Sequence, residues 1–359
     1  MPTLHVRGRV LPGGRVGDVF VVDGRFTFAP QPDARTLITD AYLIPGLVDA
    51  HAHLGMASPA PRNATPRQRS EASAAAHLHA GVLVVREPGG PDRASSEIGP
   101  ARGLPRVQTA GRFLAPPGRY FPGLPREIPM EELPQAAVEE AKASGSRWAK
   151  AIGDFPDEDG ALAPNWTLAV LSDAVRAVHA IGARFAMHCV GAAAIELAIE
   201  AGVDTIEHGN AMTADGIREM KRKRLAWTPT LDIIPLITGA LDGMLTDESM
   251  ASLGSALDAQ PSRVREAHEA GVRILAGTDA GMGPHGMVRE EMRLLLEAGL
   301  PAEAVLAAGS WDARRYFGYP GIEEGAPADL VAFRDDPRDP DELAHPALIM
   351  LDGRVVSPA

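Results

Sequence analysis

Two histidines separated by one residue stand at the end of an apolar segment, 43–51, and are the first candidates for chemistry. They are His51 and His53. In a β-strand, residues i and i+2 point to the same face, so both imidazole rings can approach one ion. Imidazole is a good ligand for zinc, iron and nickel. A single His-x-His pair is a weak signal, because such pairs also arise by chance at strand edges.

Four further residues with polar side chains lie on, or at the end of, later apolar segments. Each alone has an ordinary structural explanation: a core histidine, a lysine whose ammonium reaches solvent, or an aspartate that caps the next helix. Their joint placement at successive strand ends instead predicts a divalent-metal site. These residues are Lys150, His188, His208 and Asp279.

Apolar strand-like segments alternate with helical patterns through the centre of the chain, residues 45–318. Within one such pattern, Leu168, Leu171, Val175 and Val178 are spaced for a single helical face. Eight strand–helix units predict an α/β fold, a (β/α)8 TIM barrel, whose active site lies at the C-terminal ends of the strands. The strand candidates are 43–51, 81–87, 105–111, 147–153, 183–189, 203–209, 225–231 and 272–279.

The two ends of the chain have a different pattern. Residues 1–44 and 319–359 contain short β-branched segments that are split by Gly, Pro and Asp turn signals. Chain termini often lie close together, so strands from both ends can pair. We expect a small composite β-sandwich subdomain beside the barrel of residues 45–318.

The chain resembles the amidohydrolase superfamily of metal-dependent hydrolases. The resemblance extends over nearly the whole sequence, and within the superfamily it is strongest to the branch of Xaa-Pro dipeptidases, arginine carboxypeptidase-like enzymes and imidazolonepropionase-related proteins. It is carried by PGLVDAHAHL (45–54), Lys150, MHCVG (187–191), IEHGN (206–210), GTDAG (277–281) and IEEGAPADLVAF (322–333).

The resemblance implies a centre of two divalent metal ions, for which zinc is expected and iron, cobalt or manganese are alternatives. His51, His53 and Asp279 would hold one ion, and His188 and His208 the other. Lys150 would be N-carboxylated and bridge both ions. Independent chemistry agrees, because an ammonium cannot ligate a cation, whereas a carbamate offers two anionic oxygens.

The implied reaction is hydrolysis of a non-aromatic amide (C–N) bond in a small molecule. A metal-bridging hydroxide would attack the carbonyl carbon, and Asp279 would act as general base and then general acid. A dipeptide, an N-acyl amino acid or a cyclic amide would suit this chemistry. A lactone or ester would suit the same site.

Other classes remain open at this stage. Many deaminases of the superfamily have a glutamate three positions after the fifth-strand histidine, where this chain has Gly191. That difference, with Lys150, disfavours a mononuclear imidazolone hydrolase or deaminase. A lyase that forms a Schiff base on Lys150 is a further alternative, but it would leave the four histidines without a role. A non-catalytic barrel scaffold would be expected to have lost ligands.

Three residues are candidates for substrate binding. Arg119 and Tyr120 lie in the loop after the third strand, and His285 lies in the GMGPHG loop after the eighth. Arg119 would either pair with a substrate carboxylate or stay at the surface. His285 would either reach the substrate or only fold its loop.

Composition excludes several classes of function. The chain has 359 residues and a formal net charge of −12, which argues against binding of nucleic acid or an anionic membrane. The single cysteine, Cys189, excludes an intramolecular disulfide framework and multi-cysteine metal sites. Neither a secretory signal nor a membrane-spanning run is evident, so we expect a cytoplasmic protein. A homo-oligomer is left open.

Overall fold

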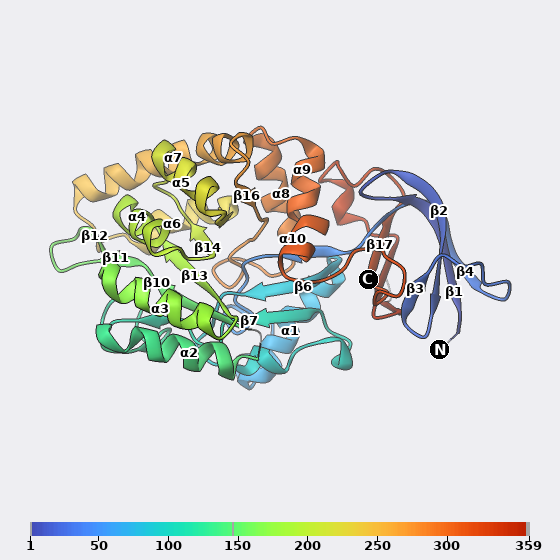
Figure 1. Cartoon of the computed structure of the whole chain (residues 1–359), viewed down its shortest axis with the longest axis horizontal. Helices are drawn as coiled ribbons and strands as arrows, with labels where there is room; N and C mark the ends of the chain where they lie inside the picture. Colours follow the sequence, from blue (N-terminus) through green and yellow to red (C-terminus); the bar gives the residue numbers. More distant parts are fainter. Residues whose placement is uncertain (1, 146, 357–359) are drawn as a thin grey trace.

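Parallel strands close into a barrel at the centre of the molecule (Figure 1). The computed structural model describes residues 2–145 and 147–356. Its barrel strands form two hydrogen-bonded groups, β5-β6-β7 and β16-β15-β14-β13-β10-β8-β9. Bridges from Gly90 to Arg112 and from Ala52 to Ala280 join these groups into a continuous wall. The strands are β5 (Leu47–Asp49), β6 (Val82–Glu87), β7 (Arg106–Thr109), β8 (Leu114–Ala115), β9 (Arg126–Glu127), β10 (Trp148–Ile152), β13 (Arg184–Cys189), β14 (Thr205–His208), β15 (Ala226–Thr228) and β16 (Arg273–Ile274).

Every predicted strand segment contains one of these strands, so the TIM-barrel prediction is confirmed. β6 and β10 are buried along their whole length, as expected for parallel strands that are covered on both faces. The third barrel position is divided between β7 and β8, and Gly111 between them has a φ of 73°. Glycine adopts this left-handed conformation without the steric penalty of other residues.

Helices cover the outside of the barrel wall (Figure 1). In α3, Thr167 caps the helix by accepting a hydrogen bond from the amide of Val170. Leu171, Val175 and Val178 are buried on one face, as their spacing predicts. The helices are α1 (Pro66–His79), α2 (Leu133–Ala143), α3 (Leu168–Ala180), α4 (Ala192–Ala201), α5 (Ala214–Lys223), α6 (Ile234–Ala240), α7 (Asp247–Glu269), α8 (Val288–Glu297), α9 (Ala302–Ala308) and α10 (Trp311–Tyr316).

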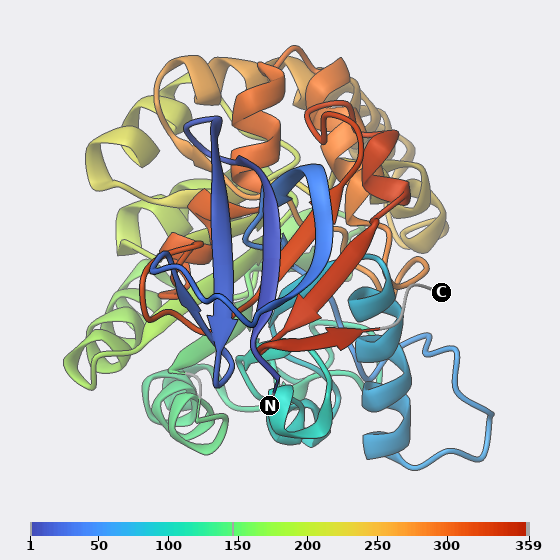
Figure 2. The same ribbon diagram turned by 90° about the vertical axis from the view of Figure 1, so that its right-hand side faces the viewer.

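Strands from both ends of the chain pair beside the barrel, as predicted, in one continuous mixed sheet (Figure 2). The strands are β1 (Leu4–Val10), β2 (Arg15–Val22), β3 (Arg25–Thr27), β4 (Arg35–Ile44), β17 (Leu330–Phe333), β18 (Leu348–Leu351) and β19 (Arg354–Val356), in the order β19-β18-β17-β4-β1-β2-β3.

The sheet is mixed because β1 pairs with β4 in parallel, whereas its other strand pairs are antiparallel. Gly8 allows the close approach, because a Cβ there would lie 2.1 Å from the carbonyl oxygen of Ala41. The sheet also curls, since a Cβ on Gly353 after β18 would lie 2.4 Å from the Cα of Gly24 after β2. One continuous sheet therefore encloses its own apolar core, which includes Val6.

A buried carboxylate connects this sheet to the barrel. Asp329, just before β17, accepts hydrogen bonds from Arg106 on β7 at 2.8 Å and from Arg314 on α10 at 2.9 Å. Asp329 and Arg314 are each 1% exposed. The predicted domain boundaries fall in the links from β4 to β5 and from α10 to β17. Among the described residues, the helices are too short or too polar to span a membrane.

Candidate metal centre

Three ligand atoms from the first and last barrel strands converge at the centre of the barrel mouth. Nε2 of His51 lies 3.3 Å from Nε2 of His53. Oδ1 of Asp279 lies 3.3 Å from the first of these nitrogens and 3.1 Å from the second. Ligands at about 2.0–2.2 Å around a tetrahedral zinc ion are about 3.3–3.6 Å apart. The three atoms therefore have spacings that fit one face of a metal coordination sphere.

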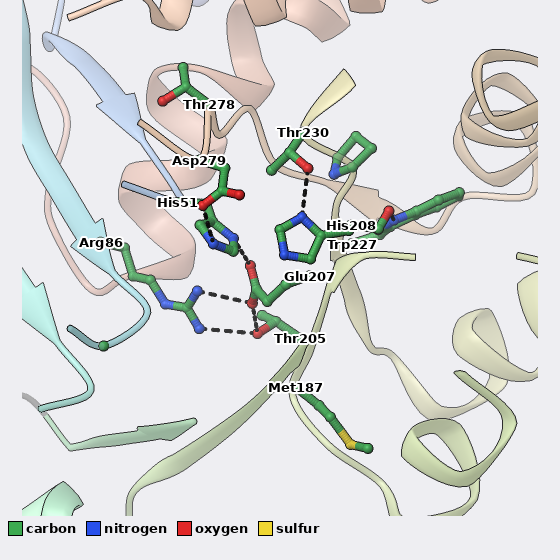
Figure 3. Close-up of polar contacts among 12 residues, drawn as sticks. His51, Arg86, Met187, Thr205, Glu207, His208, Trp227, Thr230, Thr278 and Asp279 are labelled. Carbon is green, nitrogen blue, oxygen red and sulfur yellow. Dashed lines mark hydrogen bonds and ion pairs between the residues drawn. The ribbon is translucent and has the colours of Figure 1, made fainter. Parts of the chain in front are cut away.

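Hydrogen bonds on the opposite side of each ring orient the ligand nitrogens. His53 Nδ1 donates to the carbonyl oxygen of Gly89 at 2.5 Å, which leaves its Nε2 as the lone-pair nitrogen. Nδ1 of His51 lies 2.7 Å from Oε2 of Glu207, and Nδ1 of His208 lies 2.8 Å from Oγ1 of Thr230 (Figure 3). Such outer contacts fix the tautomer and orientation of metal-binding imidazoles.

His188 and His208 extend the cluster from β13 and β14. Their ring centroids are 4.7 Å apart, and the ring of His208 lies 4.9 Å from that of His51. Ligand atoms of His51, His208 and Asp279 all lie within 4.8 Å of one another. Nδ1 of His188 is buried and has no hydrogen-bond partner among the described residues. Buried polar atoms are normally paired, so this nitrogen also fits a ligand role.

Lys150 lies on β10 and is 2% exposed, and its charge contributes to the lowered pKa values of His53, His188 and His208. Its Nζ lies 5.8 Å from the centre of the Phe113 ring. Burial lowers the pKa of Lys150 to about 8, although the carboxylates of Glu207 and Asp279 oppose that shift. Neutral amine is therefore accessible near neutral pH. This is the form that adds carbon dioxide, so the lysine suits the carbamate that the family resemblance implies.

Burial also sets the charge of the ligands. It lowers the pKa of His53 to about 4 and of His208 to about 3, and holds that of His188 well below its usual value. Burial raises the pKa of Asp279, but contacts with His51 and His53 outweigh it and hold the pKa well below the usual range. Neutral imidazoles beside an ionised carboxylate are the forms that bind a divalent cation.

A buried ion pair between Arg86 and Glu207 contacts the Nδ1 side of the His51 ring. This pair was not predicted from the sequence. Nη1 of Arg86 lies 2.9 Å from Oε1 of Glu207, and Thr205 donates to the same oxygen at 2.5 Å (Figure 3). Adjacent residues of a strand normally point to opposite faces, so the sequence does not indicate that Glu207 and His208 both approach His51. His208 ends β14 with a φ of 63°, so its ring and the Glu207 carboxylate both reach His51.

The three predicted substrate residues have different surroundings. The ring of Tyr120 lies 5.5 Å from that of His188, so it is at the site. Arg119 donates instead to Asn165 and to three backbone carbonyls, those of residues 155, 156 and 163. Its guanidinium therefore braces a hairpin, and the arrangement gives no support to a substrate contact. Nε2 of His285 donates to the carbonyl of Met56 at 2.9 Å, so this residue folds its loop.

A pocket opens beside the metal ligands. His188, His208 and Asp279 lie at its polar end together with Tyr120 and Asp154. Its other walls are largely apolar and include Phe121, Phe155, Leu162, Ile233, Ile237 and Leu241. A barrel with this pocket and these ligands at the C-terminal ends of its strands defines a metal-dependent hydrolase of the TIM-barrel class.

The chain belongs to the Amidohydrolase family, whose sequence profile matches residues 42–358. Uncharacterized protein Rv2915c of Mycobacterium tuberculosis is 38% identical over 359 residues, which are 99% of this chain and 96% of that protein. Ochratoxinase of Aspergillus niger is 30% identical over 157 residues, which are 42% of this chain and 32% of the enzyme.

Among solved structures, a Xaa-Pro dipeptidase with bound methionine in its active site aligns with a TM-score of 0.81 and 22% identity, over 99% of both chains. At this identity the likeness supports the fold alone. The resemblance that the sequence motifs indicate is thus confirmed at the level of the family. The protein is an amidohydrolase-family, metal-dependent hydrolase.

Proposed function

We propose that the protein hydrolyses an amide bond in a small molecule at a centre of two divalent ions. His51, His53 and Asp279 would hold one ion, and His188 and His208 the other. The observation that carries the proposal is the convergence of the first three ligand atoms at 3.1–3.3 Å of one another. The ions would polarise the substrate carbonyl and lower the pKa of water.

Lys150 would complete the centre as a carbamate. Its neutral amine attacks carbon dioxide, a nitrogen–carbon bond forms, and one proton leaves the nitrogen. The product is a carbamate whose single negative charge is shared by two oxygens, in place of an ammonium, and the released proton passes to water. The lowered pKa of Lys150, about 8, supports this step because it increases the neutral fraction at pH 7.

Asp279 is the proton carrier in this proposal. It lines the pocket, and its contacts with two imidazoles hold it ionised at neutral pH. It would accept a proton from the attacking water and return it to the departing nitrogen. The carbonyl–nitrogen bond breaks, so the products are a carboxylate and an amine.

The substrate class is also part of the proposal. One structural neighbour is a Xaa-Pro dipeptidase, and one sequence relative is an ochratoxinase. From these neighbours and the site chemistry we infer a dipeptide, an N-acyl amino acid or a cyclic amide. The apolar walls of the pocket favour substrates that carry a hydrophobic group.

The first experiment is elemental analysis of protein produced with bicarbonate and added divalent metal, compared with Lys150→Ala. We expect about two ions per chain in the parent protein, about one in the variant, and a loss of most amide hydrolysis. Short carboxylic acids such as propionate should partly restore both. Lys142→Ala, which removes an exposed lysine, is the matched control.

Two other results would contradict the proposal. One ion per chain that Lys150→Ala does not change would indicate a mononuclear centre. Absence of metal, with trapping of a carbonyl substrate on Lys150 by borohydride, would indicate a Schiff-base lyase.

A further inference from the structure

A second carboxylate, that of Asp154, lines the pocket, but Asp154 is not one of the proposed metal ligands. It begins β11 (Asp154–Pro156), which forms a hairpin with β12 (Leu162–Pro164) directly after β10. It is 1% exposed and lines the pocket together with His188 and Tyr120. Its position four residues after Lys150 places it at the metal end of the pocket.

Backbone amides hold this carboxylate in a fixed orientation. Gly191 N donates to Oδ2 at 2.6 Å, and Val190 N lies 3.1 Å from both oxygens. A Cβ on residue 191 would lie 3.2 Å from Oδ2, so glycine there leaves room for the carboxylate. Arg119 fixes the same hairpin through three of its carbonyl groups. The carboxylate is therefore preorganised rather than mobile.

The carboxylate retains capacity to accept another hydrogen bond. Burial raises the pKa of Asp154 to about 7, and a cation in the pocket would favour its ionised form. That form has about four lone-pair sites, and the two amides do not fill them. His188 Nε2 lies 3.8 Å from Oδ1, which is beyond hydrogen-bond distance. Among the described residues, Asp154 forms no ion pair with an arginine or lysine. Buried carboxylates are normally paired, so this one fits a cation that arrives with the ligand.

The remainder of the pocket indicates what that cation is attached to. Phe121, Phe155 and Leu162 line it, together with Ile233, Ile237 and Leu241 from the segment after β15. Met282, which also lines the pocket, is 40% exposed. A hydrophobic side chain of a substrate would be buried here.

We propose that Asp154 binds the ammonium group of an aminoacyl amide whose side chain is hydrophobic. This inference rests on the proposed function, because the carbonyl carbon next to that ammonium would stand at the metal centre. For L-leucinamide, water adds its oxygen to the carbonyl carbon and the carbon–nitrogen bond breaks. The products are leucine and ammonia.

The decisive comparison uses L-leucinamide and 4-methylpentanamide, which differ only in the amino group. Metal-loaded protein should hydrolyse leucinamide with a kcat/KM about 10–100-fold higher, the range expected for one charge-assisted hydrogen bond. Asp154→Asn should remove this preference, so that the ratio of the two kcat/KM values falls to about one. Glu158→Gln, which neutralises an exposed carboxylate on the same hairpin, should preserve it.

A binding measurement separates recognition from catalysis and from direct contact with metal. 3-Methylbutylamine is an ammonium ion at neutral pH, so it has no lone pair for a metal. Calorimetry should show at least about 10-fold weaker binding to Asp154→Asn than to the parent protein or to Glu158→Gln. Metal analysis of Asp154→Asn should give the parent value. If Asp154→Asn fails to fold, the comparison of the two amides and the binding of the amine still test ammonium recognition in the parent protein.

The outcomes distinguish this inference from the proposed function. Faster hydrolysis of N-acetyl-L-leucine than of leucinamide would overturn the role of Asp154 and leave amide hydrolysis intact. A preference for leucinamide over 4-methylpentanamide that persists in Asp154→Asn would also overturn the role of Asp154 and leave amide hydrolysis intact. Binding of the amine without hydrolysis of any amide would support Asp154 and overturn the proposed reaction. Equal binding of the amine to both proteins would overturn the inference.

Discussion

Glu207→Gln tests whether the buried pair behind His51 supports both the fold and the metal centre. Glu207 is 0% exposed, and Arg86, its partner at 2.9 Å, is 1% exposed. Glutamine has nearly the same shape but no charge, so the guanidinium would be left without its counterion inside the barrel. The same change replaces the carboxylate that faces His51 Nδ1 at 2.7 Å.

Two magnitudes follow from these contacts. Removing one partner of a buried ion pair costs about 3–5 kcal/mol, because the other charge remains desolvated. We therefore expect the free energy of unfolding to fall by this amount. Loss of an outer carboxylate that orients a metal-bound imidazole weakens metal binding by about 10–100-fold. Metal affinity at the His51 site should fall within that range.

Urea unfolding of metal-free protein measures the first effect, and competition with a chromophoric chelator measures the second. Glu139→Gln is the control, because it breaks only an exposed pair with Arg126 and should leave the free energy of unfolding nearly unchanged. The double variant Arg86→Met with Glu207→Leu should recover stability but not metal affinity. A loss below about 1 kcal/mol in Glu207→Gln, or unchanged metal affinity, would refute the reasoning.

Three further changes test other parts of the structure. Asp329→Asn should cost about 3–5 kcal/mol at neutral pH, because it leaves Arg314 unpaired. Burial raises the pKa of Asp329, but Arg106 and Arg314 outweigh this and lower it. The stabilisation is therefore present above the unfolded-state pKa and is lost as pH falls through the folded-state value, so parent and variant unfolding curves should converge in acid. Gly277→Ala should reduce metal content and lower the melting temperature, because the new Cβ would lie 2.5 Å from Cγ2 of Thr228; unchanged values would contradict the packing. Chelation should lower the melting temperature of the parent protein by mass action, and restored metal should reverse it.

The barrel was predictable because each of its strands is an apolar run that is followed by a helical pattern. β13, for example, ends in Cys189, whose side chain is buried, while the adjacent His188 reaches the pocket. The terminal subdomain was only partly predictable. Its strands are evident in the sequence, but whether β1 pairs with β4 depends on contacts between distant residues.

The clustering of the four histidines and Asp279 was predictable, because each of these candidate ligands is a metal-binding residue type at the end of a predicted strand segment. The surroundings of those ligands were not predictable. From the sequence, Arg119 could have been free to bind a substrate carboxylate. In the fold its guanidinium donates to Asn165 and to the backbone carbonyls of residues 155, 156 and 163. No motif singles out Asp154, and the Val190 and Gly191 amides that orient its carboxylate come close to it only in the folded chain.

Backbone conformation explains why strand alternation alone could not locate the centre. His208 ends one strand, Thr230 and Asp279 follow two others, and all three have positive φ values, 63°, 50° and 53°. This conformation is unfavourable for residues other than glycine, so the surrounding contacts must stabilise it. His208 and Thr230 hydrogen-bond to each other, and Asp279 N donates to the carbonyl of His51 at 2.7 Å. The turns that bring the ligands together are thus stabilised by the ligands' own contacts, which no local sequence pattern records.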